Sequence, residues 1–246
     1  VTSMQLLNSS DNKIDVKSLT ITAYPNPPTP TVVNIIPDNI NGTKLLDANT
    51  VYVMTTDLGF PAGAFYITGE NSIVDCQGHS FYAADIHADN VTIKNCVNTG
   101  TIAVWENHGT VQNNTFSPTP NTTSGTVKSE TSAPGKSGHL ITGNTFQPTI
   151  PSNLIDDPIL FQNVTDVVVS NNIIHASGDI EIEGVGYFHL MTISGNTFPS
   201  PSGAFIGGWF DDAHSQGFTS YKVNILNNSF KSSTGCWSWS TLACGG

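Results

Sequence analysis

The sequence predicts an all-β fold in which short parallel strands stack into a solenoid. Asn, Ser, Thr and Gly are abundant, whereas the helix formers Lys, Arg, Glu, Met and Gln are scarce. A short alternating phrase that ends in asparagine also recurs, at spacings from 19 to 32 residues, which suits one coil of variable length. The length of 246 residues allows one large domain with a sizeable core.

The recurring phrase has the pattern of a half-buried strand, with apolar residues at alternate positions. In a solenoid each strand can bury its apolar side only against the strands before and after it, so Ile, Val and Phe are expected to point inward. The asparagine is expected at a sharp turn, where its amide bonds to the amides stacked above and below. We expect a structural ladder made of Asn95, Asn114, Asn144, Asn172, Asn196 and Asn228.

The two ends of the chain differ from the repeats between them. We divide the chain into an amino-terminal strand and linker over residues 1–36, a solenoid over 37–232 and a carboxyl-terminal cap over 233–246. The amino-terminal part holds an alternating segment, residues 14–23, and then a proline-rich stretch, residues 24–31, that favours an extended conformation. Two interpretations are open: the strand caps its own first coil, or it pairs with a neighbouring subunit.

Four cysteines in a secreted chain predict two disulfides. Cys236 with Cys244 would close the carboxyl-terminal loop, and Cys76 with Cys96 would join matching positions on successive coils. A separation of one rung places two α-carbons within the range that a disulfide accepts, about 4.4–6.8 Å. The alternative for Cys76 and Cys96 is a pair of reduced cysteines packed as small core residues.

The charge balance argues against nucleic acid and anionic membranes as partners. Nineteen acidic residues stand against eight basic ones, which gives a net charge of −11, and every basic residue is a lysine. A chain without arginine and with a net negative field is poorly suited to phosphate recognition. The sequence also has no apolar run of 18 residues, so no transmembrane segment is expected.

Composition and sequons together predict a secreted or cell-surface protein. The chain begins Val1-Thr2-Ser3, without a start methionine or a signal segment, as a mature secreted product or a trimmed chain would. Seven Asn-x-Ser/Thr sequons are candidate glycosylation sites, although several overlap the structural repeat. They lie at Asn8, Asn41, Asn90, Asn113, Asn121, Asn163 and Asn227.

The repeats, together with the segments 49–58 and 64–79, resemble the parallel β-helix repeat proteins of the pectin-lyase-like superfamily. The opening segments are similar to NosD-like carbohydrate-binding and sugar-hydrolysis repeat domains, and the resemblance covers about residues 45–232. It implies a right-handed parallel β-helix, here of about seven or eight coils. Because the superfamily includes lyases, hydrolases, phage tailspikes, adhesins and non-enzymatic surface proteins, function must be argued from the site.

Acidic residues in three consecutive coils are the candidate catalytic groups. They are Asp156 and Asp157, then Asp179, Glu181 and Glu183, then Asp211 and Asp212. In the middle group, alternation is expected to turn Ile180 and Ile182 inward and all three carboxylates outward. Stacked acids at about 5–9.5 Å would suit glycoside hydrolysis, and we assign Asp157, Glu181, Asp211 and Asp212 to it. The alternative is that these acids only solvate the outer surface.

Aromatic residues near Asp211 and Asp212 are candidates for substrate binding. Trp209, Phe210 and Tyr221 could stack on pyranose faces, or could equally be ordinary packing residues, and we select Trp209 and Tyr221.

Other chemistries find little support in the sequence. Pectate-type lyases depend on basic residues that grip uronate, and this chain has no arginine and no basic cluster. The seven histidines show no metal-ligand spacing, and with three methionines they give no soft-metal cluster of the kind that copper delivery by NosD would imply. Stacked acids would suit calcium, but no metal site is assigned and no cofactor is expected.

These observations favour an extracellular structural or adhesive surface protein over an enzyme. Low charge, the lack of a basic substrate grip and an amino-terminal strand suited to head-to-tail contacts predict self-association, as a subunit of a filament or surface layer. The alternatives are a glycoside hydrolase acting on a neutral polysaccharide and a glycan-binding, tailspike-like module.

Overall fold

The computed structural model describes residues 29–35, 43–58, 64–97, 100–117, 126–130, 136–147, 158–175, 180–185, 190–199, 205–209, 222–231 and 235–238. Within these ranges the regular elements are all β-strands, and they form long parallel sheets, so the all-β prediction is confirmed. The same ranges contain no helix with the length and apolarity that a membrane crossing requires.

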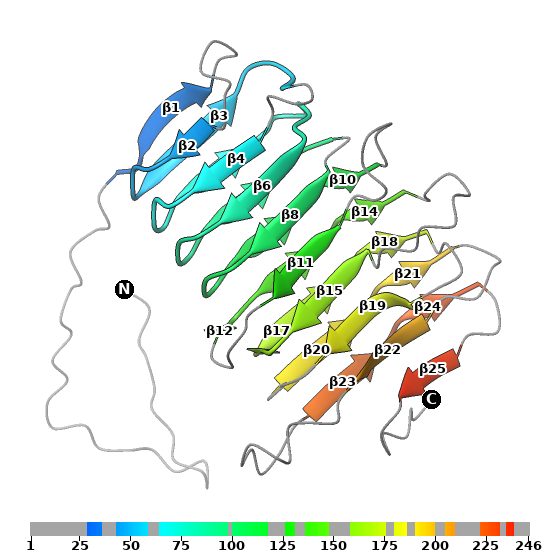
Figure 1. Cartoon of the computed structure of the whole chain (residues 1–246). Helices are drawn as coiled ribbons and strands as arrows, with labels where there is room; N and C mark the ends of the chain where they lie inside the picture. Colours follow the sequence, from blue (N-terminus) through cyan, green and yellow to red (C-terminus); the bar gives the residue numbers. More distant parts are fainter. Residues whose placement is uncertain are drawn as a thin grey trace, which may run out of the picture.

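Two nine-stranded sheets form most of the structure (Figure 1). The first sheet consists, in spatial order, of β1 (Thr31–Ile35), β3 (Thr50–Met54), β5 (Ile73–Asp75), β7 (Thr92–Lys94), β9 (Thr110–Gln112), β13 (Leu140–Thr142), β17 (Val167–Ser170), β20 (Leu190–Ser194) and β23 (Lys222–Leu226). The second sheet consists of β2 (Thr43–Leu45), β4 (Ala64–Ile67), β6 (Ala83–Ile86), β8 (Thr101–Val104), β11 (Val127–Glu130), β15 (Ile159–Gln162), β19 (Ile180–Val185), β22 (Phe205–Trp209) and β25 (Gly235–Ser238).

Two smaller sheets complete the described part. The short sheet has five two-residue strands, β10 (Thr115–Phe116), β14 (Thr145–Phe146), β18 (Ile173–Ile174), β21 (Thr197–Phe198) and β24 (Ser229–Phe230). A separate parallel pair joins β12 (Lys136–Ser137) to β16 (Val164–Thr165).

The chain visits the sheets in the same order each time it returns. Each strand of the first sheet is followed by one of the second sheet, and from β9 onward a strand of the short sheet lies between them. Figure 1 shows the strands following one another from blue β1 at one end to red β25 at the other. Each long sheet has nine strands, of which β1 and β2 lie ahead of the segment 49–58, where the resemblance to known repeats begins.

The core is formed by inward side chains that share a register position on successive strands. Ile93, Val111 and Ile141 lie opposite one another on neighbouring strands and are fully buried. In the short sheet the rings of Phe116 and Phe146 stack with their centroids 4.6 Å apart. Such a pair contributes about 0.5–1.5 kcal/mol beyond its burial. The inward columns therefore provide the packing that the repeat predicted.

Residues with a positive φ lie at both ends of four strands of the first sheet. Asn90 and Asn95 flank β7, and His108 and Asn113 flank β9, with φ between 55° and 59°. The same five-residue interval separates Gly138 from Gly143 and Asp166 from Asn171. Asparagine, aspartate and glycine tolerate this conformation, and apart from His108 they are the residue types at these positions.

Candidate functional site

Five asparagines form a continuous hydrogen-bonded column along the turn that follows the first sheet. Asn144 is representative: its backbone N–H and its Nδ2 both donate to Oδ1 of Asn172, at 2.9 and 3.0 Å. Its Nδ2 also donates to the backbone oxygen of Val111 at 2.9 Å. The same contacts link the whole asparagine column, which consists of Asn114, Asn144, Asn172, Asn196 and Asn228.

Asn95 does not belong to this column, and its assignment to the ladder was wrong. The matching residue in its repeat is Cys96, whose backbone N–H donates to Oδ1 of Asn114 at 2.9 Å. Asn95 instead has a φ of 59° and occupies the left-handed position immediately before it, as Asn113 does before Asn114. The repeat therefore uses asparagine in two successive roles, one for the turn and one for the column.

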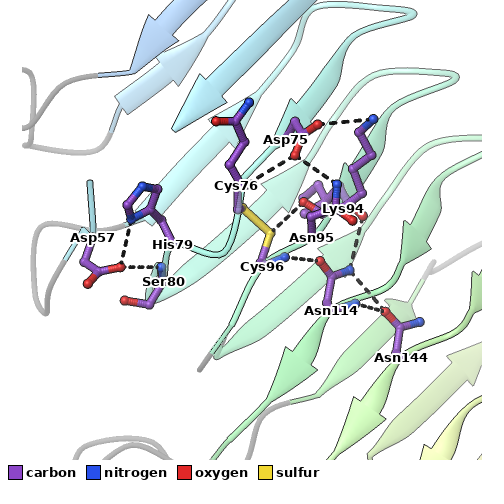
Figure 2. The surroundings of a disulfide bond; sticks show 12 residues. Asp57, Asp75, Cys76, His79, Ser80, Lys94, Asn95, Cys96, Asn114 and Asn144 are labelled. Carbon is purple, nitrogen blue, oxygen red and sulfur yellow. Dashed lines mark hydrogen bonds and ion pairs between the residues drawn. A yellow bond between two sulfur atoms is a disulfide. The ribbon is translucent and has the colours of Figure 1, made fainter. Parts of the chain in front are cut away.

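The predicted disulfide between Cys76 and Cys96 is present at the amino-terminal end of the asparagine column (Figure 2). The two α-carbons are 4.8 Å apart, one rung of parallel sheet, and both residues are buried. A covalent link thus takes the place that amide pairs occupy in later repeats. Cys236 lies in β25, where side chains are outside the description, and Cys244 is outside the described residues, so their pairing stays a prediction.

Polar groups on the outer side of the disulfide are tied together across two strands (Figure 2). Oδ1 of Asp75 accepts hydrogen bonds from Nδ2 of Asn95 at 3.0 Å and from the backbone N–H of Gln77 at 3.2 Å. Its Oδ2 pairs with Nζ of Lys94 at 3.3 Å. Burial opposes ionisation of Asp75, but these donors outweigh it, so the pKa of the carboxyl lies below its usual value. These contacts hold the ends of β5 and β7 together, which is a structural role.

Most of the predicted catalytic and sugar-binding residues lie outside the part of the chain that the structure describes. Asp157, Asp211, Asp212 and Tyr221 are outside the described residues. Glu181 lies in β19 where the register with β22 shifts, because Ile180 pairs with Phe205 but Ile182 pairs with Ile206. The regular alternation expected around Glu181 is therefore interrupted at that residue.

Trp209 is the last residue of β22 and pairs with Val185. Along β19 this register position lies four residues beyond Glu181, a distance of about 13 Å at the rise of a parallel strand. The backbone therefore sets Glu181 and Trp209 toward opposite ends of two neighbouring strands.

A partly exposed aromatic group along the second sheet was not predicted from the sequence. The rings of Tyr66 and His87 lie with centroids 4.6 Å apart, and those of His87 and Trp105 with centroids 5.9 Å apart. Nε1 of Trp105 lies 3.5 Å from Oδ1 of the exposed Asp85. The 18 residues between His87 and Trp105 equal the register offset between β6 and β8, and Asp85 lies directly opposite Tyr66 on the neighbouring strand, so placing these residues in register could have revealed the group. We call these four residues the aromatic group.

A buried serine and histidine connect the two long sheets. His139 is 1% exposed, and its Nε2 lies 3.3 Å from Oγ of Ser129. The backbone N–H of Gly109 donates to Nδ1 of His139, so the neutral ring carries its proton on Nε2 and donates it to Ser129. Burial, and then the charges of His108 and Lys136, lower the pKa of His139 to about 4. An imidazole in this tautomer cannot take the proton of Ser129, so the pair is structural rather than nucleophilic.

The described sequons occupy turns. Asn90, Asn113 and Asn227 are exposed and have positive φ, and Asn163, with a φ of 56°, is half-buried. Asn8, Asn41 and Asn121 are outside the described residues. The repeat itself produces two of the sequons, since Asn113 and Asn227 each precede a column asparagine and the Thr or Ser that opens the next strand.

No three His, Cys, Asp or Glu side chains among the described residues are grouped so that they could hold a metal ion. Comparisons of the chain with family models, with curated proteins and with solved structures find no match.

Proposed function

We propose that this chain is an extracellular structural or adhesive surface protein whose body is a right-handed parallel β-helix. The supporting features are two parallel sheets of nine strands each and one shared core. Such a body is a spacer that holds its two ends at a fixed distance. One buried disulfide and three exposed sequons fit an oxidising, extracellular setting.

The asparagine column with its disulfide is the observation that carries this proposal. From Cys76 to Asn228 it links seven successive layers by hydrogen bonds or a covalent bond, and six of its seven residues are 0–1% exposed. Every layer is tied to the next at the same place, so local bending or fraying must break bonds that are shielded from water. Resistance to fraying is the property that a mechanical spacer needs.

We further propose that copies associate end to end. Within the described part, β1 and β2 are the terminal strands at one end of the long sheets, and β23 and β25 are the terminal strands at the other. Because all the strands are parallel, the edge at one end can continue the edge at the other by simple translation, and such a contact propagates without closing. Val223, Ile225 and Phe230 are only partly buried at the β23 end, which leaves apolar surface for a following copy.

Negative-stain microscopy combined with light scattering tests the proposal. We expect rods of uniform width whose length and mass increase with protein concentration. Lys231 is exposed beside the β23 end, so a Lys231→Cys variant, biotinylated at the new thiol and labelled with gold, would locate the joints. A strictly monomeric, compact particle at all concentrations would contradict end-to-end association, and a single non-assembling rod would leave only the spacer role.

The aromatic group supports a second candidate function, glycan binding. Tyr66 is 40% exposed, and Asp85 provides a carboxylate beside the indole N–H of Trp105. Aromatic rings with adjacent hydrogen-bonding groups suit neutral sugars. A neutral-glycan array should then give signals that Trp105→Ala removes. The matched control is Leu46→Ala, which truncates an exposed apolar side chain outside the group and should keep the signals. Equal binding by both variants would contradict this function.

The glycoside hydrolase that the sequence also suggested stays a prediction. It requires Asp157, Glu181, Asp211 or Asp212 to form a pair at hydrolase distance, and activity on a neutral polysaccharide that disappears in the corresponding amide variants would support it.

A further inference from the structure

Aliphatic side chains cover the outer face of the first sheet at its amino-terminal end. Val32, Val51 and Ile73 share one outward register position on β1, β3 and β5. Val32 is 65% exposed and the other two are half-buried, as is Val53 on the adjacent outward position. We call Val32, Val51, Val53 and Ile73 the amino-terminal patch.

The sheet itself does not require aliphatic residues at this outward position. On the next two strands the same column continues with Thr92 and Thr110, which pair with Ile73 and with each other. Threonine favours strands as valine does, but it gains less from leaving water. Aliphatic residues return farther along at Leu140 and Val168, which are half-buried as Val51 and Ile73 are, so the mostly exposed Val32 on the terminal strand is what distinguishes the amino-terminal end. A chain segment that packs over these side chains and removes them from water would explain why they are aliphatic.

Within residues 14–23, the second half, residues 19–23, has the pattern of a strand with one apolar face, whereas Ile14 and Val16 lie on the opposite parity. Leu19, Ile21 and Ala23 alternate with Thr20 and Thr22, so a strand over these residues would present three apolar side chains on one side and hydroxyls on the other. An amphipathic strand of this kind needs a single apolar surface to pack against.

The connection to β1 is long enough for this segment to reach the patch of its own chain. Seven residues, 24–30, separate it from Thr31, the first residue of β1. At about 3.1 Å per residue in an extended proline-rich conformation they span roughly 22 Å. To lie on the face of the sheet the segment must sit about 10 Å above it, and to cover three strands it must extend about 10 Å across them. The linker is long enough for both.

We propose that residues 14–23 fold back over the outer face of β1, β3 and β5 and pack Leu19, Ile21 and Ala23 against the amino-terminal patch. The short tether gives the segment a high effective concentration at its own patch, on the order of millimolar, so the contact forms within one chain. In this position the segment would no longer be available as the head-to-tail contact that the sequence suggested. The edges of the terminal strands, on which end-to-end association is proposed above, would stay open, so the two proposals can fail separately.

Limited proteolysis with trypsin tests the contact in the full chain. Because every basic residue is a lysine, trypsin can cut the segment only after Lys17, two residues before Leu19. The variant Val32→Thr/Val51→Thr/Ile73→Thr removes the aliphatic surface with a residue that the same column already contains. The matched control is Leu140→Thr/Val168→Thr, which changes two half-buried residues of the same column farther along the sheet.

We expect cleavage after Lys17 to be slow in the unaltered chain and in the control, and to be faster on the order of tenfold or more in the triple-threonine variant. The rate should not change with protein concentration. Equal rates in all three proteins would overturn the proposal, as would protection that appears only at high concentration, which would place the segment on a second copy. Circular dichroism verifies that the triple-threonine variant keeps its sheet content.

Discussion

At the scale of single residues, two adjacent positions in each turn have different roles: one allows the backbone to turn, and the other bonds to the neighbouring repeats. The first position holds a left-handed residue, Asn113, Gly143 or Asn171, and the second holds a buried asparagine, Asn114, Asn144 or Asn172. The first position needs tolerance of positive φ, and the second needs an amide that both donates and accepts. Asparagine satisfies both demands, and therefore the two positions look alike in the sequence.

Replacing Asn144 with leucine should strongly destabilise the protein. The change would leave the backbone N–H and Nδ2 of Asn114 and the backbone oxygen of Val111 without their buried partner. A buried polar group without a partner costs about 1–3 kcal/mol, so we expect a loss of roughly 3 kcal/mol or more. Urea denaturation measures it. The exposed Asn113→Gly is the control and should lose less than about 1 kcal/mol, because its φ suits glycine.

Replacing Gly143 with alanine should destabilise for two separable reasons. Gly143 has a φ of +66°, and an added Cβ would lie 2.4 Å from Oδ1 of Asn113. The left-handed conformation alone costs alanine about 1–2 kcal/mol. In a double-mutant cycle, Asn113→Gly/Gly143→Ala should recover the part due to the contact but not the part due to φ. Strictly additive effects in thermal unfolding would show that Asn113 moves aside without cost.

At the scale of elements, the disulfide and the asparagine pairs have the same structural role. Both link one repeat to the next at the residue after the first-sheet turn. Cys96 also keeps the backbone donor that joins the asparagine column, because its N–H bonds to Asn114. The column can therefore change from amides to sulfur without a change in backbone path.

Converting both cysteines to asparagine should recover part of the stability that the disulfide provides. Closing a loop between residues 20 apart stabilises by about 3 kcal/mol. We expect Cys76→Ser/Cys96→Ser to lose an amount of this order, and Cys76→Asn/Cys96→Asn to lose less, because the new amides extend the column. Urea denaturation under non-reducing conditions compares the two variants. A greater loss in the asparagine variant would mean that the first layers cannot accept amides.

The strands could be predicted from the sequence better than the sites could. The phrases ending in Cys96, Phe116 and Phe146 form strands as expected, because their alternation survives packing. Asn95 was misplaced because the phrases were aligned by residue identity, whereas the structure aligns them by the five-residue interval between left-handed positions. The aromatic group escaped notice because its members contact one another only once the register of the second sheet is known.

At the scale of the whole molecule, one buried histidine makes stability depend on pH. His139 joins the first sheet to Ser129 of the second through its neutral ring. Its pKa falls from 6.5 to about 4 in the folded state, so the unfolded chain binds the extra proton first as the pH decreases. The stabilisation is complete above pH 6.5 and is lost as the pH falls toward 4. Asp75, whose pKa is also lowered, adds a further loss in more acidic solution.

We therefore expect the free energy of unfolding to fall by up to about 3 kcal/mol between pH 7 and pH 4, since each unit of pKa shift corresponds to about 1.4 kcal/mol. Urea titrations at several pH values measure it. His139→Gln should flatten the profile over this range, because glutamine does not titrate there, whatever its effect on stability at neutral pH. His108→Gln is the control: burial is the largest cause of the lowered pKa of His139 and the charge of His108 a smaller one, so this variant should keep most of the slope. An unchanged slope in His139→Gln would mean that other groups carry the dependence.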